Sequence, residues 1–186
     1  MQRKVEGAFV CITPHTTEFS HFEKLEKIDL PLIFFDKVPF QRGFIKVCVA
    51  DEQAASMSAS ALINSGKKKI LSLFGDMQMS ISKRRHDAYL RVFDEHVMSH
   101  ELTVEIATNA EAARQLVFLD SKKTEKPEAI FCMSDEILIG AMKAIQMLGL
   151  KVPDEVAIIS ISNGFFPKLY HPEIAYVETS GYKLGK

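Results

Sequence analysis

The sequence has almost no net charge and no long apolar run, and each shortage excludes a class of protein. Its 23 basic residues nearly balance 24 acidic residues, which leaves a formal net charge of −1. Such a chain has no field that would attract nucleic acid or an anionic membrane from a distance. No stretch approaches the roughly 18 apolar residues that a membrane-spanning helix requires. We therefore expect neither direct DNA binding nor membrane insertion.

Cysteine is also scarce. Cys11, Cys48 and Cys132 all lie in apolar stretches typical of buried strands. An odd number of buried thiols favours a reducing compartment over a disulfide framework. The N-terminal segment lacks the apolar core of a signal peptide. We therefore expect a cytoplasmic protein.

Motifs of the common catalytic and metal sites are missing as well. No serine lies in a Gly-x-Ser-x-Gly turn, and Gly75 stands alone where a phosphate-binding loop needs several glycines. His96 and His100 are four residues apart, but the glutamate of the zinc motif and a third ligand are lacking. We predict no catalytic residue, no metal and no cofactor.

What the chain contains is an alternation of apolar, strand-like runs with stretches of helical periodicity. This order predicts an α/β fold whose parallel sheets have helices on both faces. The expected strands are 7–12, 32–35, 47–50, 70–74, 104–106, 129–132 and 156–161, and the expected helices are 18–28, 52–65, 82–98, 110–119 and 135–148.

The stretch from Ala129 to Ile161 predicts a complete strand-helix-strand unit. Ser134 offers a side-chain oxygen at the helix N-cap, and Asp135 and Glu136 occupy the first turn, where acids suit the helix dipole. Gly149 then supplies the left-handed residue with which many helices end.

This unit also carries a family resemblance. The order Ser134–Glu136, Ile139–Ala144 and Gly149–Val156 resembles the effector-binding domain of LacI/GalR-type transcription regulators. The resemblance continues through segments 30–37, 47–55, 62–70, 85–89 and 169–185. It implies two Rossmann-like parallel-sheet lobes, the periplasmic-binding-protein-like type I arrangement, with a ligand cleft between them.

The resemblance also implies a division of the chain. Residues 1–66 would form an incomplete N-terminal lobe, residues 67–177 the C-terminal lobe, and residues 178–186 the crossover back to the first lobe. The basic run 67–69 near the first boundary is interpreted as a solvated junction. Because only three strands are expected in the first lobe and no DNA-binding head is found, we expect a chain truncated at both ends.

Four residues qualify as ligand contacts, because ligands of open α/β sheets bind beyond the carboxyl ends of the strands. They are Asp51, Arg85, Ser134 and Ser162, and the matching family positions hydrogen-bond a sugar or purine effector. Asp51 and Ser134 also suit plain N-caps, and Arg85 also suits an ion pair with Asp51 or Asp76. We expect truncation of Arg85 to harm binding more than folding.

The function implied is that of a ligand-sensing and dimerisation domain rather than an enzyme. The expected effector is a small polar molecule, preferably a sugar or sugar derivative, and operator DNA would be reached only through a head domain. Small residues within Ala54–Ile63 suit either a homodimer interface or packing inside a lobe. The alternatives are a periplasmic sugar-binding protein of the same architecture and an enzyme of nucleotide-binding fold, which would require a glycine-rich turn.

The balance of charge generates a first prediction. The purified chain should not retard duplex DNA in a gel, even at low ionic strength, because it offers no surplus of cations to replace counterions on the phosphates. Submicromolar binding that weakens as salt is added would contradict this expectation.

Overall fold

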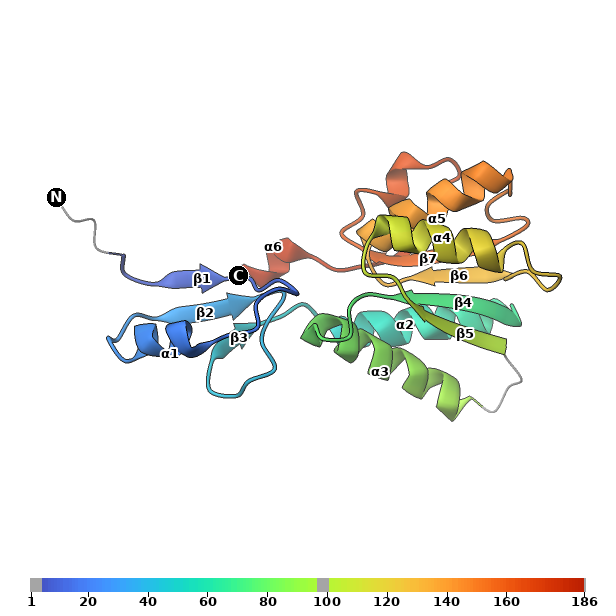
Figure 1. Cartoon of the computed structure of the whole chain (residues 1–186). Coiled ribbons are helices and arrows are strands. Elements are labelled where there is room, and N and C mark those ends of the chain that lie inside the picture. The colour runs from blue at the N-terminus through green and yellow to red at the C-terminus, as the bar shows by residue number, and fades with distance from the viewer. Residues whose placement is uncertain (1–4, 97–100, 186) are drawn as a thin grey trace.

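The strand-helix alternation produces two lobes, each built on a parallel sheet (Figure 1). The computed structural model describes residues 5–96 and 101–185. The strands are β1 (Ala8–Val10), β2 (Leu32–Phe35), β3 (Ile45–Val47), β4 (Lys69–Phe74), β5 (Glu101–Ile106), β6 (Ala129–Cys132), β7 (Ala157–Ser162) and β8 (Ala175–Glu178). The helices are α1 (Ser20–Glu26), α2 (Asp51–Asn64), α3 (Ser80–Glu95), α4 (Ala110–Asp120), α5 (Asp135–Leu148) and α6 (Gly181–Leu184), with a short 3₁₀ helix at Pro167–Leu169.

The larger lobe is a three-layer sandwich. Its five strands lie in the order β5-β4-β6-β7-β8, with α4 and α5 on one face and α2 and α3 on the other (Figure 1). All four residues of β6 are buried, as expected of a central strand covered on both faces. Beneath α3, the Tyr89 ring stacks on Phe131 at 4.5 Å, and its hydroxyl shares a hydrogen bond of 2.7 Å with Ser72. The predicted α/β class with parallel sheets is confirmed.

The predicted N-cap and C-terminal residue of α5 are also confirmed. The Ser134 hydroxyl accepts a hydrogen bond from the Ile137 N–H at 3.5 Å, which makes Ser134 the N-cap. Gly149 ends the helix with φ of 67°, a left-handed value that glycine adopts without a steric penalty. Local sequence therefore fixes where α5 begins, and the first turn of α5 lies directly after the carboxyl end of β6.

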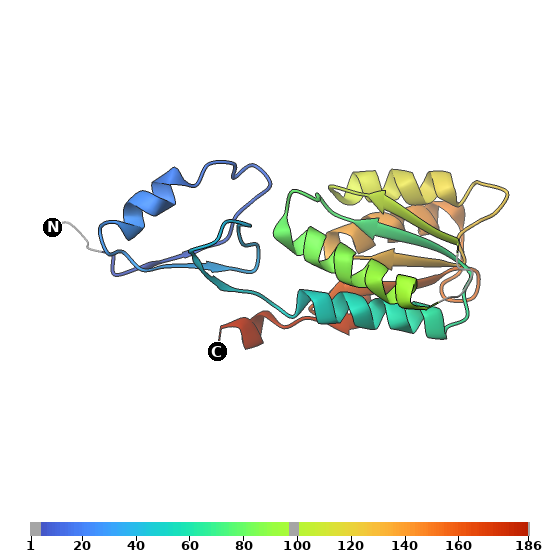
Figure 2. The same ribbon diagram turned by 90° about the horizontal axis from the view of Figure 1, so that it is seen from below.

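The smaller lobe has the strand order β1-β2-β3, with α1 against one face (Figure 2). Leu32 and Phe34 are buried on the α1 side, whereas Phe9 and Ile45 on the opposite face are 76% and 60% exposed. Met79 and Ile81, which lie at the start of α3 in the larger lobe, complete the small lobe's core. The two lobes are therefore joined by apolar packing as well as by the chain.

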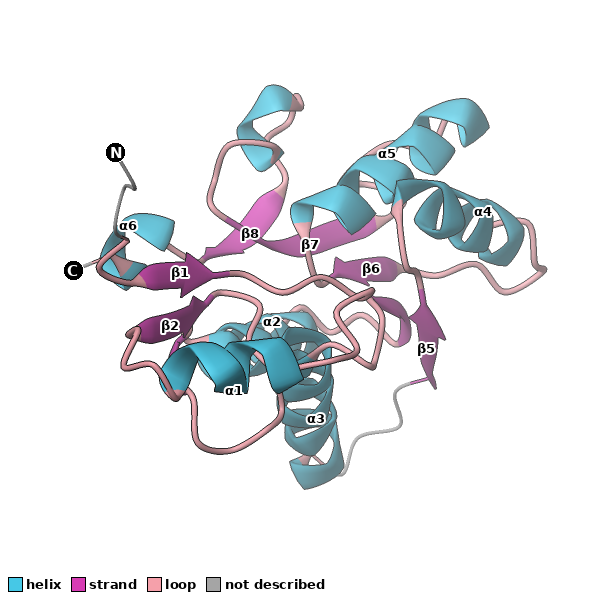
Figure 3. Cartoon of the chain, turned by 60° about the vertical axis from the view of Figure 1, so that its left-hand side comes forward, coloured by secondary structure: helices cyan, strands magenta, loops and turns pink. Residues whose placement is uncertain are grey.

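The polypeptide crosses to the larger lobe earlier than expected. α2 packs against α3, β7 and β8, so it belongs to the larger lobe, and the crossing lies between β3 and α2 rather than after residue 66. Strand β3 also lies at 45–47 instead of 47–50, in register with β2. After β8, the chain leaves the large sheet for α6, which lies near β1 (Figure 3).

The small residues of α2 face inward. Ala55 and Ala59 are fully buried between α2 and the rest of the larger lobe, so the lobe-packing alternative is correct for this stripe and the homodimer interpretation of it is wrong.

The expectation that all three cysteines are buried is wrong for two of them. Cys11, which follows β1, is exposed, and Cys48, which follows β3, is partly exposed. No helix among residues 5–96 and 101–185 is long and apolar enough to cross a membrane.

Close packing of α4 on α5 generates a second prediction. A Cβ at Gly140 would lie 2.0 Å from the Ala110 carbonyl oxygen, a backbone atom that cannot move without shifting α4. Gly140→Ala should therefore lower the free energy of unfolding in urea by about 1–3 kcal/mol. Gly181→Ala is the matched control, since its added methyl meets nothing within 4 Å. Equal stability of the two variants would contradict the predicted helix contact.

Candidate ligand-binding site

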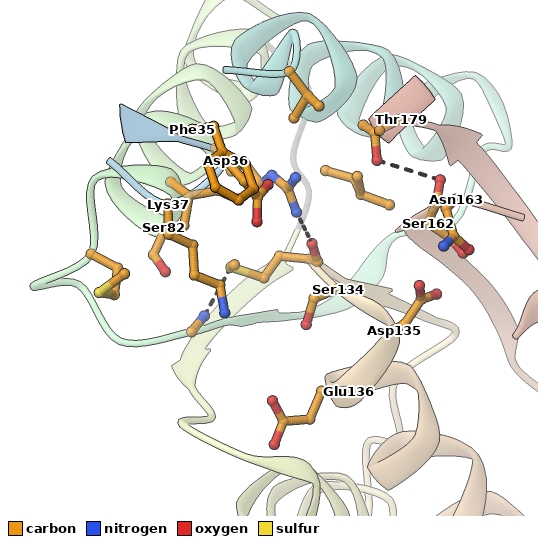
Figure 4. Close-up of a pocket in the computed structure, with 18 of the residues that line it drawn as sticks. Phe35, Asp36, Lys37, Ser82, Ser134, Asp135, Glu136, Ser162, Asn163 and Thr179 are labelled. Atoms are coloured by element: carbon orange, nitrogen blue, oxygen red, sulfur yellow. Dashed lines mark hydrogen bonds between the residues drawn. The ribbon is translucent and has the colours of Figure 1, made fainter. Parts of the chain in front are cut away.

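A cleft of about 880 Å³ opens between the two lobes at the carboxyl ends of their strands (Figure 4). The larger lobe contributes the residues that follow β4, β5, β6 and β7, together with the first turns of α3 and α5. The smaller lobe contributes β2, the end of β3, and the residues Asp36 and Lys37. Polar groups from both lobes therefore face one space that is otherwise lined by apolar side chains.

Arg85 lines the cleft, although it is only 5% exposed. Its Nε donates to the Asp51 carboxylate at 2.9 Å, and one terminal nitrogen donates to the Met133 carbonyl oxygen at 2.5 Å. Burial lowers the pKa of the guanidinium, and the Asp51 carboxylate opposes that shift. The residue is thus held as a charged group at the end of β6.

Asp51 lies behind Arg85 and does not line the cleft. Its side chain is completely buried at the start of α2 and also accepts a hydrogen bond from Arg84. The ion pair that the sequence left open as an alternative is therefore present, and Asp51 positions Arg85 in this structure. It sits in the larger lobe, not in the first lobe where the sequence division had placed it.

Ser134 and Ser162 both line the cleft, and each has a local hydrogen bond. Ser134 caps α5, as described above. The Ser162 hydroxyl accepts from the Gly164 N–H at 3.0 Å, which leaves its own proton able to donate. Three of the four predicted contacts, Arg85, Ser134 and Ser162, are thus brought to one cleft.

Sequence reasoning missed several lining residues. Asp36 and Lys37 directly follow β2, and the rule that selected Ser162 would have selected them too. Asp135 was interpreted only as a first-turn acid of α5, but its side chain also lines the cleft. Thr179 lies beside Ser162 and donates to its carbonyl oxygen from both its backbone N–H and its hydroxyl.

The histidine and cysteine candidates stay apart from this site. The His96 ring Nδ1 lies 2.7 Å from the Val92 carbonyl oxygen, and His100 lies outside the described residues. Burial raises the pKa of the Cys132 thiol, and burial also raises that of Cys48 although the nearby Arg84 opposes the shift. A raised pKa disfavours the thiolate, so neither cysteine is primed as a nucleophile.

Residues 59–186 match the family described as the periplasmic binding protein-like domain. The chain belongs to this family. Two curated relatives match nearly the whole of this chain. The HTH-type transcriptional repressor PurR of Vibrio atlanticus is 24% identical over 188 residues, which cover 100% of this chain and 56% of that protein. Catabolite control protein A of Priestia megaterium is 26% identical over 98% of this chain and 55% of its own length.

Solved structures agree with this assignment of the periplasmic-binding-protein-like fold. A LacI family transcriptional regulator from Enterococcus faecium, solved with bound ribose, superposes with a TM-score of 0.84 at 16% identity, covering 97% of this chain and 67% of that one. The resemblance to LacI-type regulators is therefore confirmed. The chain spans about half the length of the curated relatives that it matches.

The paired arginines generate a third prediction, which reverses our expectation for Arg85. Arg85→Ala removes two hydrogen bonds of a buried charged group, to Asp51 and to the Met133 carbonyl oxygen, and should lower the free energy of unfolding by about 3–5 kcal/mol. Arg84→Ala is the matched control. Because the Arg84 side chain is 24% exposed and Asp51 keeps Arg85, its loss should cost about 1–2 kcal/mol. Urea denaturation measures the stability of both variants. A loss of stability for Arg85→Ala that is no larger than the loss for Arg84→Ala would contradict this prediction.

Proposed function

We propose that this chain is the effector-binding part of a LacI-type transcription regulator, and that a small polar ligand, preferably a sugar or sugar derivative, binds in the cleft between its lobes. The observation that carries the proposal is the cleft itself. Arg85, Ser134 and Ser162 reach it from three elements of the larger lobe, and Asp36 and Lys37 reach it from the smaller lobe. A ligand that touches both sets would favour one arrangement of the lobes.

The relatives support this reading. The V. atlanticus relative is named a transcriptional repressor, and the E. faecium structure of the same fold is that of a LacI family transcriptional regulator with bound ribose. Operator DNA would be contacted by a separate head domain, because the balanced charge of this chain gives no general attraction to phosphates. The unpaired cysteines favour a reducing compartment, and we place the protein in the cytoplasm.

The energetic requirement is modest. A ligand shifts an equilibrium between two lobe arrangements only by its difference in affinity for them, and coupling energies of about 1–3 kcal/mol are typical. One or two hydrogen bonds made only in the favoured arrangement supply this amount. Homodimerisation, which the resemblance implies, would have to use a surface other than the buried stripe of α2.

A thermal-shift screen with sugars, sugar derivatives and purines tests the proposed function. A ligand present at one hundred times its dissociation constant should stabilise the chain by about 2.7 kcal/mol. Ser162→Ala removes one hydroxyl donor from the cleft and should weaken binding of that ligand about threefold to tenfold. Ser121→Ala is the matched control, because Ser121 is another buried serine and lies outside the cleft, at the end of α4.

Two outcomes would count against the proposed function. If no member of the panel raised the melting temperature, effector binding by this chain would be unsupported. If Ser162→Ala and Ser121→Ala weakened binding equally, the ligand site would lie somewhere other than this cleft.

A further inference from the structure

The cleft lining carries more acidic than basic side chains. Four carboxylate side chains line it, those of Asp36, Asp76, Asp135 and Glu136, and the basic residues that line it are Lys37 and Arg85. The acids come from the ends of β2, β4 and β6, so they surround the space rather than gather on one helix. Carboxylates only accept hydrogen bonds when ionised, which makes the lining rich in acceptors.

Arg85 does little to offset this excess. Its charge is compensated by the buried Asp51 carboxylate at 2.9 Å, and a second donor is committed to the Met133 carbonyl oxygen. Arg84 forms ion pairs with Asp51 and Glu52, so the two arginines are matched by two carboxylates. The cation that sequence reasoning would assign to an anionic ligand is therefore already neutralised by the protein.

One acceptor stands out. Asp135 Oδ1 is buried and has no hydrogen-bond partner among the residues that the structure describes. Its residue follows the N-cap of α5, and Figure 4 shows the carboxylate pointing toward the side of the cleft that carries Ser162 and Asn163. A buried polar atom without a partner costs about 1–3 kcal/mol, which a donor group on a ligand would recover.

We propose that the cleft selects ligands that are uncharged or cationic and rich in hydrogen-bond donors, and that it rejects phosphate esters and carboxylates, with Asp135 receiving a donor from the ligand. This inference rests on the proposed function, and it narrows the ligand class. Neutral sugars, amino sugars and nucleosides satisfy it. Their phosphorylated forms would place a negative charge among four carboxylates.

The sign of the potential can be measured without knowing the ligand. In a chain carrying Cys11→Ser and Cys48→Ser, a single thiol is introduced by Thr108→Cys, at an exposed position of the cleft lining. The thiol reacts with the trimethylammonium or the sulfonate form of ethyl methanethiosulfonate. In either case the thiolate attacks the reagent's sulfenyl sulfur, forms a mixed disulfide and releases methanesulfinate.

The ratio of the two rates, compared with the same ratio at a control position, reports the local potential, because the two reagents share the reacting group and carry head groups of opposite charge. Ala61→Cys is the matched control, because Ala61 is exposed on α2 and the residues one turn away along the helix are uncharged. Relative to it, the ratio of cationic to anionic rates at Thr108→Cys should be higher by at least about fivefold, and Asp135→Asn should reduce that excess. Equal ratios at the two positions would overturn the proposal.

Ligand pairs separate this inference from the proposed function. Glucose, glucosamine, adenosine and the phosphate esters of glucose and adenosine are compared by thermal shift under identical conditions. Stabilisation by an unphosphorylated member and none by its ester is the expected result. A phosphate ester that stabilises the chain as much as its parent overturns the charge selection and leaves effector binding intact. If no member of the panel raises the melting temperature, the proposed function is overturned and the inferred ligand class with it.

Discussion

The arrangement of the cleft depends on one buried carboxylate, that of Asp51. An ionised carboxylate removed from water costs several kcal/mol unless it is well paired, and here two consecutive arginines of α3 bind it. Arg85 then continues to the Met133 carbonyl oxygen. This series of contacts fixes α2, α3 and the end of β6 relative to one another, and residues of α3 and those that follow β6 line the cleft.

Sequence reasoning succeeded where the signals are local and failed where they are tertiary. The cap at Ser134 and the stop at Gly149 depend on residues within one turn of each helix end, so α5 could be predicted almost to the residue. The small residues of α2 have helical spacing, but spacing does not say which sheet or subunit the helix covers. The face of Arg85 was likewise predictable, whereas its partner depends on how α2 packs against α3. Asp36 directly follows β2, but only the packing of the two lobes shows that it faces the same cleft as Ser162.

The smaller lobe is less completely covered than the larger lobe and depends on it for part of its core. Parallel sheets are normally covered on both faces, yet this one has α1 on one face while Phe9 and Ile45 of the other are largely exposed. Its core is closed by Met79 and Ile81 from the larger lobe. The small lobe's stability is consequently tied to the position of the α3 N-terminus, and any displacement between the lobes exposes these two side chains.

That dependence places the proposed ligand contacts next to the contact between lobes. Asp36 and Lys37 line the cleft, and the adjacent residue, Val38, is buried and accepts a hydrogen bond from the Ser80 hydroxyl at 2.5 Å. A ligand held by Asp36 would therefore act on the same short segment that receives α3. A net hydrogen bond is worth about 0.5–1.5 kcal/mol, and burial of a side chain such as Ile81 adds about 1.5–3 kcal/mol. Together these contributions come to about 2–4.5 kcal/mol, which is enough to supply the coupling of about 1–3 kcal/mol that is typical of effector control.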